Sequence, residues 1–189
     1  QSIAHNVITV TDPEDTVPMP PKDEGGSSRA IANDGGQRRV GSGWGRAAPL
    51  DFQHWQQQAE HYRTVGEVRH GDERGVSWVV ADLTPAYTNA ASGTGDFSAR
   101  RQRVRSYQRS FVFDREQQVI IVYDRVTAHD AGFRQKWLLH SELEPELQGR
   151  DFRIAAPLNP GGLRGQLHGQ VLLPEDANLT AIGGSGLEF

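Results

Sequence analysis

Arginines recur at alternate positions in one predicted strand, and this is the first pattern that could do chemistry. Residues 101–111 read RQRVRSYQRSF, and successive strand side chains point to opposite faces of a sheet. The alternation places four candidate residues on one face: Arg103, Arg105, Tyr107 and Arg109. Guanidinium groups bind carboxylates or sulfates through paired hydrogen bonds, so we predict a surface for an acidic polysaccharide, with the tyrosine ring against a sugar. An ordinary solvated sheet face is the alternative.

Histidines form the second group, and the sequence contains His5, His54, His61, His70, His129, His140 and His168. No two of them have the H-x-x-x-H or H-x-H spacing that brings two ligands to one metal ion within a single element. His5, which precedes Asn6 in a predicted strand, has three interpretations: a metal ligand, a catalytic group or strand packing. The flanking strands favour a hairpin loop for His129. The apolar run before His140 favours a buried structural histidine.

The composition removes several classes of function. The absence of cysteine excludes disulfides, thiolate nucleophiles and cysteine-ligated zinc. The net charge of −4 gives no reason to expect nucleic acid as a partner. No apolar run reaches the length of about 18 residues that would predict a membrane span. Neither a nucleophile elbow nor a phosphate-binding glycine loop occurs.

The pattern along the chain predicts strands and little helix. Residues 13–50 are rich in Pro, Gly, Ser and charge, which indicates a long excursion between strands. At most one short helix is predicted, near residues 51–61, with Asp51 as its N-cap. From residue 65 onward, short β-type runs are separated by Gly and Pro. The predicted fold class is therefore all-β, an antiparallel multi-stranded β-sandwich, in a single domain over residues 1–189.

One strand is predicted to lie at the centre of its sheet. Residues 119–123 read VIIVY and are apolar on both faces, which suits a strand covered by a layer on each side. Ile121 is therefore expected to be buried, and so is Trp137 in a later apolar run.

Six segments, taken in order, resemble a known family. They are AHNVITVTDP, NDGGQR, VVADLTPAY, RSFVFDREQQVIIVYDRV, FRQKWLLH and LHGQVLLPEDANLTAIGGSGLEF. Each segment alone is a weak signal, but together they are similar to the heparinase II/III-like family of polysaccharide lyases. Members of that family have an N-terminal α/α toroid followed by antiparallel β-sheets in a large sandwich. The chain resembles only the second part, so we expect it to lack the toroid and to be truncated at both ends.

The resemblance implies a reaction, and it implies which part of the intact protein supplies the reacting groups. Family members cleave uronate-containing polysaccharides, such as alginate or heparin and heparan sulfate, by β-elimination, which needs a base for the C5 proton and an acid for the leaving oxygen. These groups are expected upstream of residue 1, so no catalytic residue is assigned here and the isolated chain is expected to be inactive. In some members the histidine of a His-Asn pair binds zinc. His5 matches that position, with the remaining ligands expected upstream.

The resemblance also implies partners and a location. An acidic polysaccharide and the missing toroid are the expected partners, with no role for nucleic acid or a membrane span. Family members are typically periplasmic or secreted. Two alternatives remain: a carbohydrate-binding module that holds an anionic glycan without chemistry, and a structural sandwich that shields the toroid.

Overall fold

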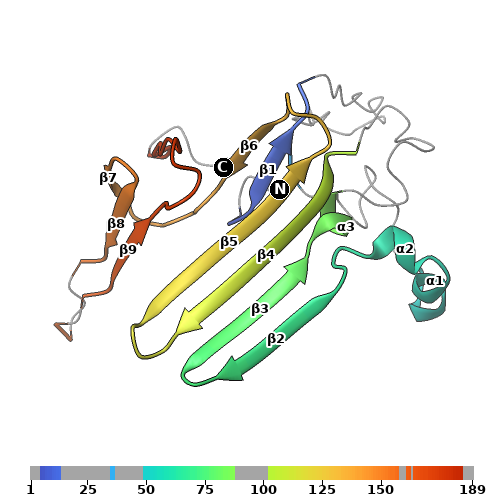
Figure 1. Ribbon diagram of the computed structural model, residues 1–189, viewed down its shortest axis with the longest axis horizontal. Helices are drawn as coiled ribbons and strands as arrows, with labels where there is room; N and C mark the ends of the chain where they lie inside the picture. The colour runs from blue at the N-terminus through green and yellow to red at the C-terminus, as the bar shows by residue number, and fades with distance from the viewer. Residues whose placement is uncertain are drawn as a thin grey trace, which may run out of the picture. The chain divides into compact units, whose positions relative to one another are not determined.

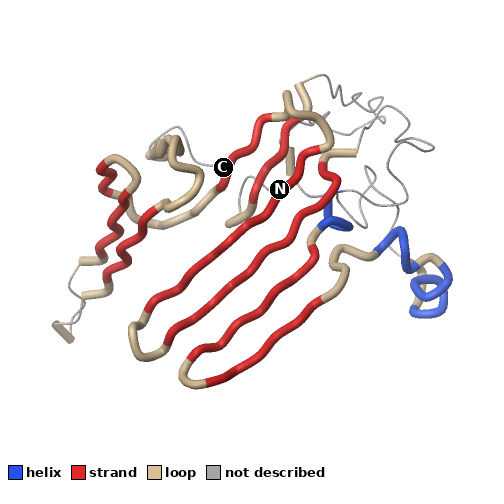
Figure 2. Tube along the Cα trace, in the orientation of Figure 1, coloured by secondary structure: helices blue, strands red, loops and turns tan. Residues whose placement is uncertain are grey.

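The computed structural model describes residues 5–13, 35–36, 49–87, 102–157, 161–162 and 164–184. Antiparallel sheet dominates these residues and the helices are short (Figure 1; Figure 2), which confirms the predicted mostly-β fold. The chain divides into two compact units, Gln1–Leu138 and Leu139–Phe189. The expectation of one domain over residues 1–189 stays a prediction.

The larger sheet of the first unit has four antiparallel strands in the order β2-β3-β4-β5. Their bounds are Val68–Glu73 for β2, Val76–Asp82 for β3, Val104–Asp114 for β4 and Val119–Ala128 for β5. The turn between β2 and β3 contains Arg74 and Gly75, with φ values of 48° and 82°. Positive φ in a two-residue turn matches the twist of the two strands that it joins.

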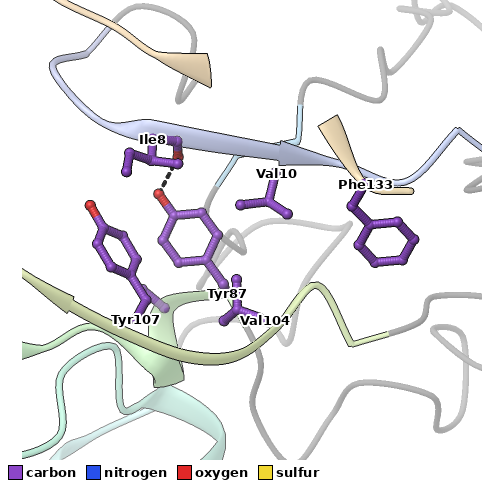
Figure 3. Close-up of a cluster of buried hydrophobic side chains, with 7 residues drawn as sticks. Ile8, Val10, Tyr87, Val104, Tyr107 and Phe133 are labelled. Carbon is purple, nitrogen blue, oxygen red and sulfur yellow. Dashed lines mark hydrogen bonds between the residues drawn. The ribbon is translucent and has the colours of Figure 1, made fainter. Parts of the chain in front are cut away.

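A smaller sheet supplies the second layer of the first unit. It consists of β1 (Ile8–Thr11) and β6 (Arg134–Trp137), which pair antiparallel. In Figure 3, Ile8 and Val10 lie above Tyr107 and Val104 of β4, and all four belong to one buried cluster. The same cluster includes Ala86, Tyr87 and Phe133. Because burial of apolar surface is the main favourable term in folding, this cluster holds β1 against one face of the four-stranded sheet.

Two short helices occupy the region where one helix was predicted. They are α1 (Phe52–Gln57) and α2 (Ala59–Tyr62). The Asp51 carboxylate accepts a hydrogen bond from the His54 backbone N–H at 2.7 Å, so the predicted N-cap is confirmed. No helix in the described part of the chain is long and apolar enough to cross a membrane.

A further one-turn helix corrects the expectation of at most one helix. This helix, α3 (Thr84–Tyr87), follows β3 directly. The Asp82 carboxylate accepts a hydrogen bond from the Thr84 backbone N–H at 2.9 Å. Local bonds of this kind offer the backbone an alternative to the strand ladder, so β3 ends and the chain turns Tyr87 into the core.

The second unit contains a three-stranded antiparallel sheet in the order β7-β8-β9. The strands are β7 (Glu146–Gln148), β8 (Asp151–Ala155) and β9 (Gln166–Gln170). Their alternation separates an apolar face, with Leu147, Phe152, Ile154 and Leu167, from a polar face. Within this unit the sheet is therefore amphipathic.

Two residues that were expected to be buried are not. Ile121 is 50% exposed and Trp137 is 42% exposed. β5 lies at the edge of its sheet and not at the centre. Ile121 pairs with Val112 and points to the face opposite the buried cluster, which includes no residue of 119–123. Trp137 lies at the last position of the short strand β6, which pairs with no strand but β1 among the described residues.

Candidate functional site

The predicted arginine stripe does not form one exposed face. The register between β4 and β5 shifts between Val104 and Ser106, so Arg105 is an additional residue at a β-bulge. One additional residue reverses the alternation, and Val104 therefore shares a face with Tyr107, in the buried cluster. The prediction that these arginines and Tyr107 point together into solvent is wrong, because nothing in the residue types marks the bulge.

Two of the predicted arginines bind backbone carbonyls. Arg103 is 8% exposed, and its Nη1 donates to the carbonyl of Val10 at 2.9 Å. Arg105 is exposed, and its Nη2 donates to the carbonyl of His129 at 3.1 Å. Both guanidinium groups therefore connect β4 to neighbouring segments of the first unit.

The other two predicted residues meet at a carboxylate that the sequence analysis missed. Arg109 donates to Asp124 through Nε at 2.7 Å and through Nη2 at 2.8 Å. Tyr107 donates its hydroxyl to the same carboxylate at 3.1 Å. Arg109 also donates to the backbone carbonyl of Asn6 at 3.1 Å. This group, which we call the Asp124 cluster, consists of Tyr107, Arg109, Asp124 and the carbonyl of Asn6.

The Asp124 cluster keeps its donors protonated. Burial raises the pKa of Tyr107 far above its ordinary value, and the negative charge of Asp124 raises it further. The hydrogen bond to Asp124 raises the pKa of Arg109. Tyr107 is 1% exposed and its ring packs edge-to-face on Tyr87 at a centroid distance of 5.3 Å. At neutral pH the phenol is therefore a hydrogen-bond donor inside the protein and not a base open to a ligand.

The cluster also fixes the segment that contains His5. Arg109 binds the residue after His5, and the Tyr87 hydroxyl donates to the carbonyl of Ile8. His5 itself is exposed, just before β1. The sheet therefore positions the His5–Asn6 pair at its surface.

A complete metal site is not present in the part of the chain that the structure describes. There, no group of three or more His, Cys, Asp or Glu side chains is placed to hold a metal ion. The described residues therefore do not form a zinc site, and the role of His5 as a ligand stays a prediction that depends on groups upstream of residue 1. His129 lies in the loop between β5 and β6, but these strands belong to different sheets, so the predicted hairpin is wrong. In this loop Asp130 accepts the Gly132 N–H at 2.8 Å. His140 is exposed, so its predicted burial is wrong.

The second unit carries an open depression of about 710 Å³, which is lined by both polar and apolar residues of its three strands. Glu146, Arg153 and His168 form one row across its three strands. Arg153 pairs with Glu146 at 3.0 Å, and Nε2 of His168 lies 3.3 Å from Oε1 of Gln166. The Arg153 and Glu146 side chains are 35% and 71% exposed, which is typical of the solvated face of a sheet.

Comparisons with known proteins do not place the chain in a family. No protein-family model, no curated protein and no solved structure matches it. The resemblance to polysaccharide lyases therefore rests on the six sequence segments alone.

Proposed function

We propose that the chain is the β-sheet part of a polysaccharide lyase that cleaves uronate-containing polysaccharides by β-elimination. The observation that supports this proposal is that five of the six segments of the resemblance meet around β1. They are far apart in the sequence, and only the fold brings them together.

The contacts of β1 connect these segments one by one. Its own segment, AHNVITVTDP, supplies Val10, whose N–H donates to the carbonyl of Gly35 in NDGGQR at 2.7 Å. Tyr87, from VVADLTPAY, packs in the buried cluster with Val10, and so does Phe133, from FRQKWLLH. Arg109, the first residue of RSFVFDREQQVIIVYDRV, binds Asn6. If the six segments resemble the family because the chain shares its fold, we expect them to contact one another in the structure, as these five do around β1.

The chemistry of the reaction is assigned to groups outside the chain. β-Elimination needs a base and an acid within about 3 Å of the reacting atoms. In the Asp124 cluster, Tyr107 is buried and its raised pKa opposes the loss of its proton. The chain is therefore proposed to position the His5–Asn6 pair and to contact polysaccharide, while the toroid supplies acid and base. From the resemblance, we also propose that the intact protein is periplasmic or secreted.

The test compares the chain alone with the chain joined to its natural upstream region. We expect the joined protein to release unsaturated uronosyl ends, measured by their ultraviolet absorbance, and to hold zinc in metal analysis. The chain alone is expected to do neither. Product formation by the chain alone would reject the assignment of catalysis to the upstream region, and no product from the joined protein on any uronate polymer would reject the lyase proposal.

A non-catalytic carbohydrate-binding module is the second candidate. Two half-exposed aromatic residues, Trp78 and Tyr123, favour it, because they lie on a sheet face away from the buried cluster. In that case the joined protein binds acidic polysaccharide and forms no product.

A further inference from the structure

The face of the four-stranded sheet opposite the buried cluster carries two exposed aromatic rings. Direct cross-strand pairs place Trp78 in one row with Val112, and Tyr123 in another row with Ser110. Ser110 and Val112 are two residues apart on β4, so both rows point to the same face, and Tyr107 points to the other. Trp78 is 38% exposed and Tyr123 is 45% exposed.

A glycine holds the indole of Trp78 against the sheet. Gly71 of β2 pairs directly with Trp78. A Cβ atom at Gly71 would lie 2.7 Å from Cε2, 2.7 Å from Nε1 and 2.8 Å from Cζ2 of the indole. Three ring atoms at nearly equal distances mean that the plane of the ring, and not its edge, covers the backbone of β2. A glycine opposite an aromatic residue is a known device for this arrangement in sheets, and it leaves the other face of the indole outward.

Arg125 lies near the ring of Tyr123, and Arg69 lies on the strand next to that of Trp78. The Cζ atom of Arg125 lies 6.0 Å from the centre of the Tyr123 ring. Arg69 shares the row of Tyr123, on the strand next to Trp78. Its side chain is 60% exposed and lies 3.6 Å from Glu67, so it is only loosely paired. From strand spacing and rise, the Cα atoms of Trp78 and Tyr123 are about 12 Å apart.

We propose that this face, through Trp78, Tyr123, Arg69 and Arg125, binds an extended acidic oligosaccharide. The apolar faces of the sugar rings lie on the aromatic rings, and the carboxylates or sulfates bind the guanidinium groups. The ligand class rests on the proposed function. An apolar protein layer is disfavoured as the occupant, because it would bury the guanidinium groups of Arg69 and Arg125, at a high desolvation cost.

The experiment measures binding of an alginate oligosaccharide of defined length to the whole chain by calorimetry at low salt. We expect Trp78→Ala and Arg125→Gln each to weaken binding by about tenfold or more, the effect of losing one ring contact or one charge-assisted bond. Gly71→Ala is the sharpest variant, because it keeps every proposed ligand-contacting group but lifts the indole off β2. It is expected to weaken binding by a similar factor. Oligosaccharide with its carboxyl groups reduced is expected to bind more weakly than the acidic form.

The matched control is Trp137→Ala, which removes an indole of similar exposure, 42%, from another strand. It should leave the affinity unchanged. If Trp78→Ala does not fold, Gly71→Ala and Tyr123→Ala carry the test. The proposal is overturned if the chain binds no acidic oligosaccharide, if all variants bind equally, or if Trp78→Ala instead abolishes association with the upstream region. Lyase assays on the joined protein test the proposed function separately, because product formation does not require binding at this face.

Discussion

The two ends of the β4–β5 hairpin are both apolar but differ in burial. At the end next to β1, Val104 and Tyr107 are each 1% exposed. At the other end, Ile120 is 55% exposed and Ile121 is 50% exposed. The buried cluster brings β1 and α3 to the first end only. An apolar strand thus offers surface for burial, and the element that packs on it determines how much is buried.

The exposed end leaves its apolar side chains in contact with water. All five residues from Val119 to Tyr123 are between 39% and 55% exposed. Because strand side chains alternate, Val119, Ile121 and Tyr123 lie on one face of the sheet and Ile120 and Val122 on the other. The comparison therefore separates a folding core at one end of the hairpin from an exposed apolar end at the other.

The largest expected effect is the loss of a core side chain. Tyr107→Ala should reduce the free energy of unfolding by about 3–5 kcal/mol, because it leaves a cavity in the buried cluster. Ile121→Ala, at the exposed end, should cost about 1 kcal/mol or less, since half of the side chain is already in water. Urea titrations followed by circular dichroism measure both values. Equal losses in the two variants would contradict the difference between the two ends.

The next effect concerns the Asp124 cluster. Asp124→Ala removes the shared acceptor of Tyr107 and Arg109, and the cost is expected to be about 2–4 kcal/mol because both donors are partly or fully buried. The control is Glu67→Ala, which removes the partner of Arg69 in an exposed pair and should cost less than about 1 kcal/mol. The same urea titrations apply. A cost for Asp124→Ala as small as that of the control would mean that the cluster does not hold β1.

Local patterns predicted the strands better than they predicted the site. The predicted strand that carries the arginines is observed as β4, Val104–Asp114, because its β-type residues end at a turn. The bulge at Arg105 was missed, since no Gly or Pro marks it. Asp124 was missed as the partner of Arg109, because this pairing depends on the register of two strands. The exposure of Ile121 depends on the order of the strands and on what covers them, which no short segment encodes.

A third prediction uses the raised pKa of Tyr107. In the unfolded chain this phenol loses its proton from about pH 10 upward, while burial keeps it protonated in the folded protein. Its contribution to stability is therefore complete below about pH 10 and is lost as the pH rises towards the folded-state pKa. Tyr107→Phe should cost about 1 kcal/mol at neutral pH and should flatten the alkaline fall in melting temperature. An alkaline profile of the variant that matches that of the wild type would reject this origin.

The smallest effect on stability separates the two edges of the four-stranded sheet. The edge strand β2 carries charges at Arg69, Asp72 and Glu73, whereas residues 119–123 of the edge strand β5 carry none. Uncharged apolar edges pair with other chains, and natural edges are protected by charge. Ile121→Lys should change the stability by less than about 1 kcal/mol, because the site is half exposed, and should reduce self-association in sedimentation velocity. Val68→Lys is the control on β2, where a further charge adds little. If the two variants change self-association to the same extent, the charges on β2 are not what distinguishes the two edge strands.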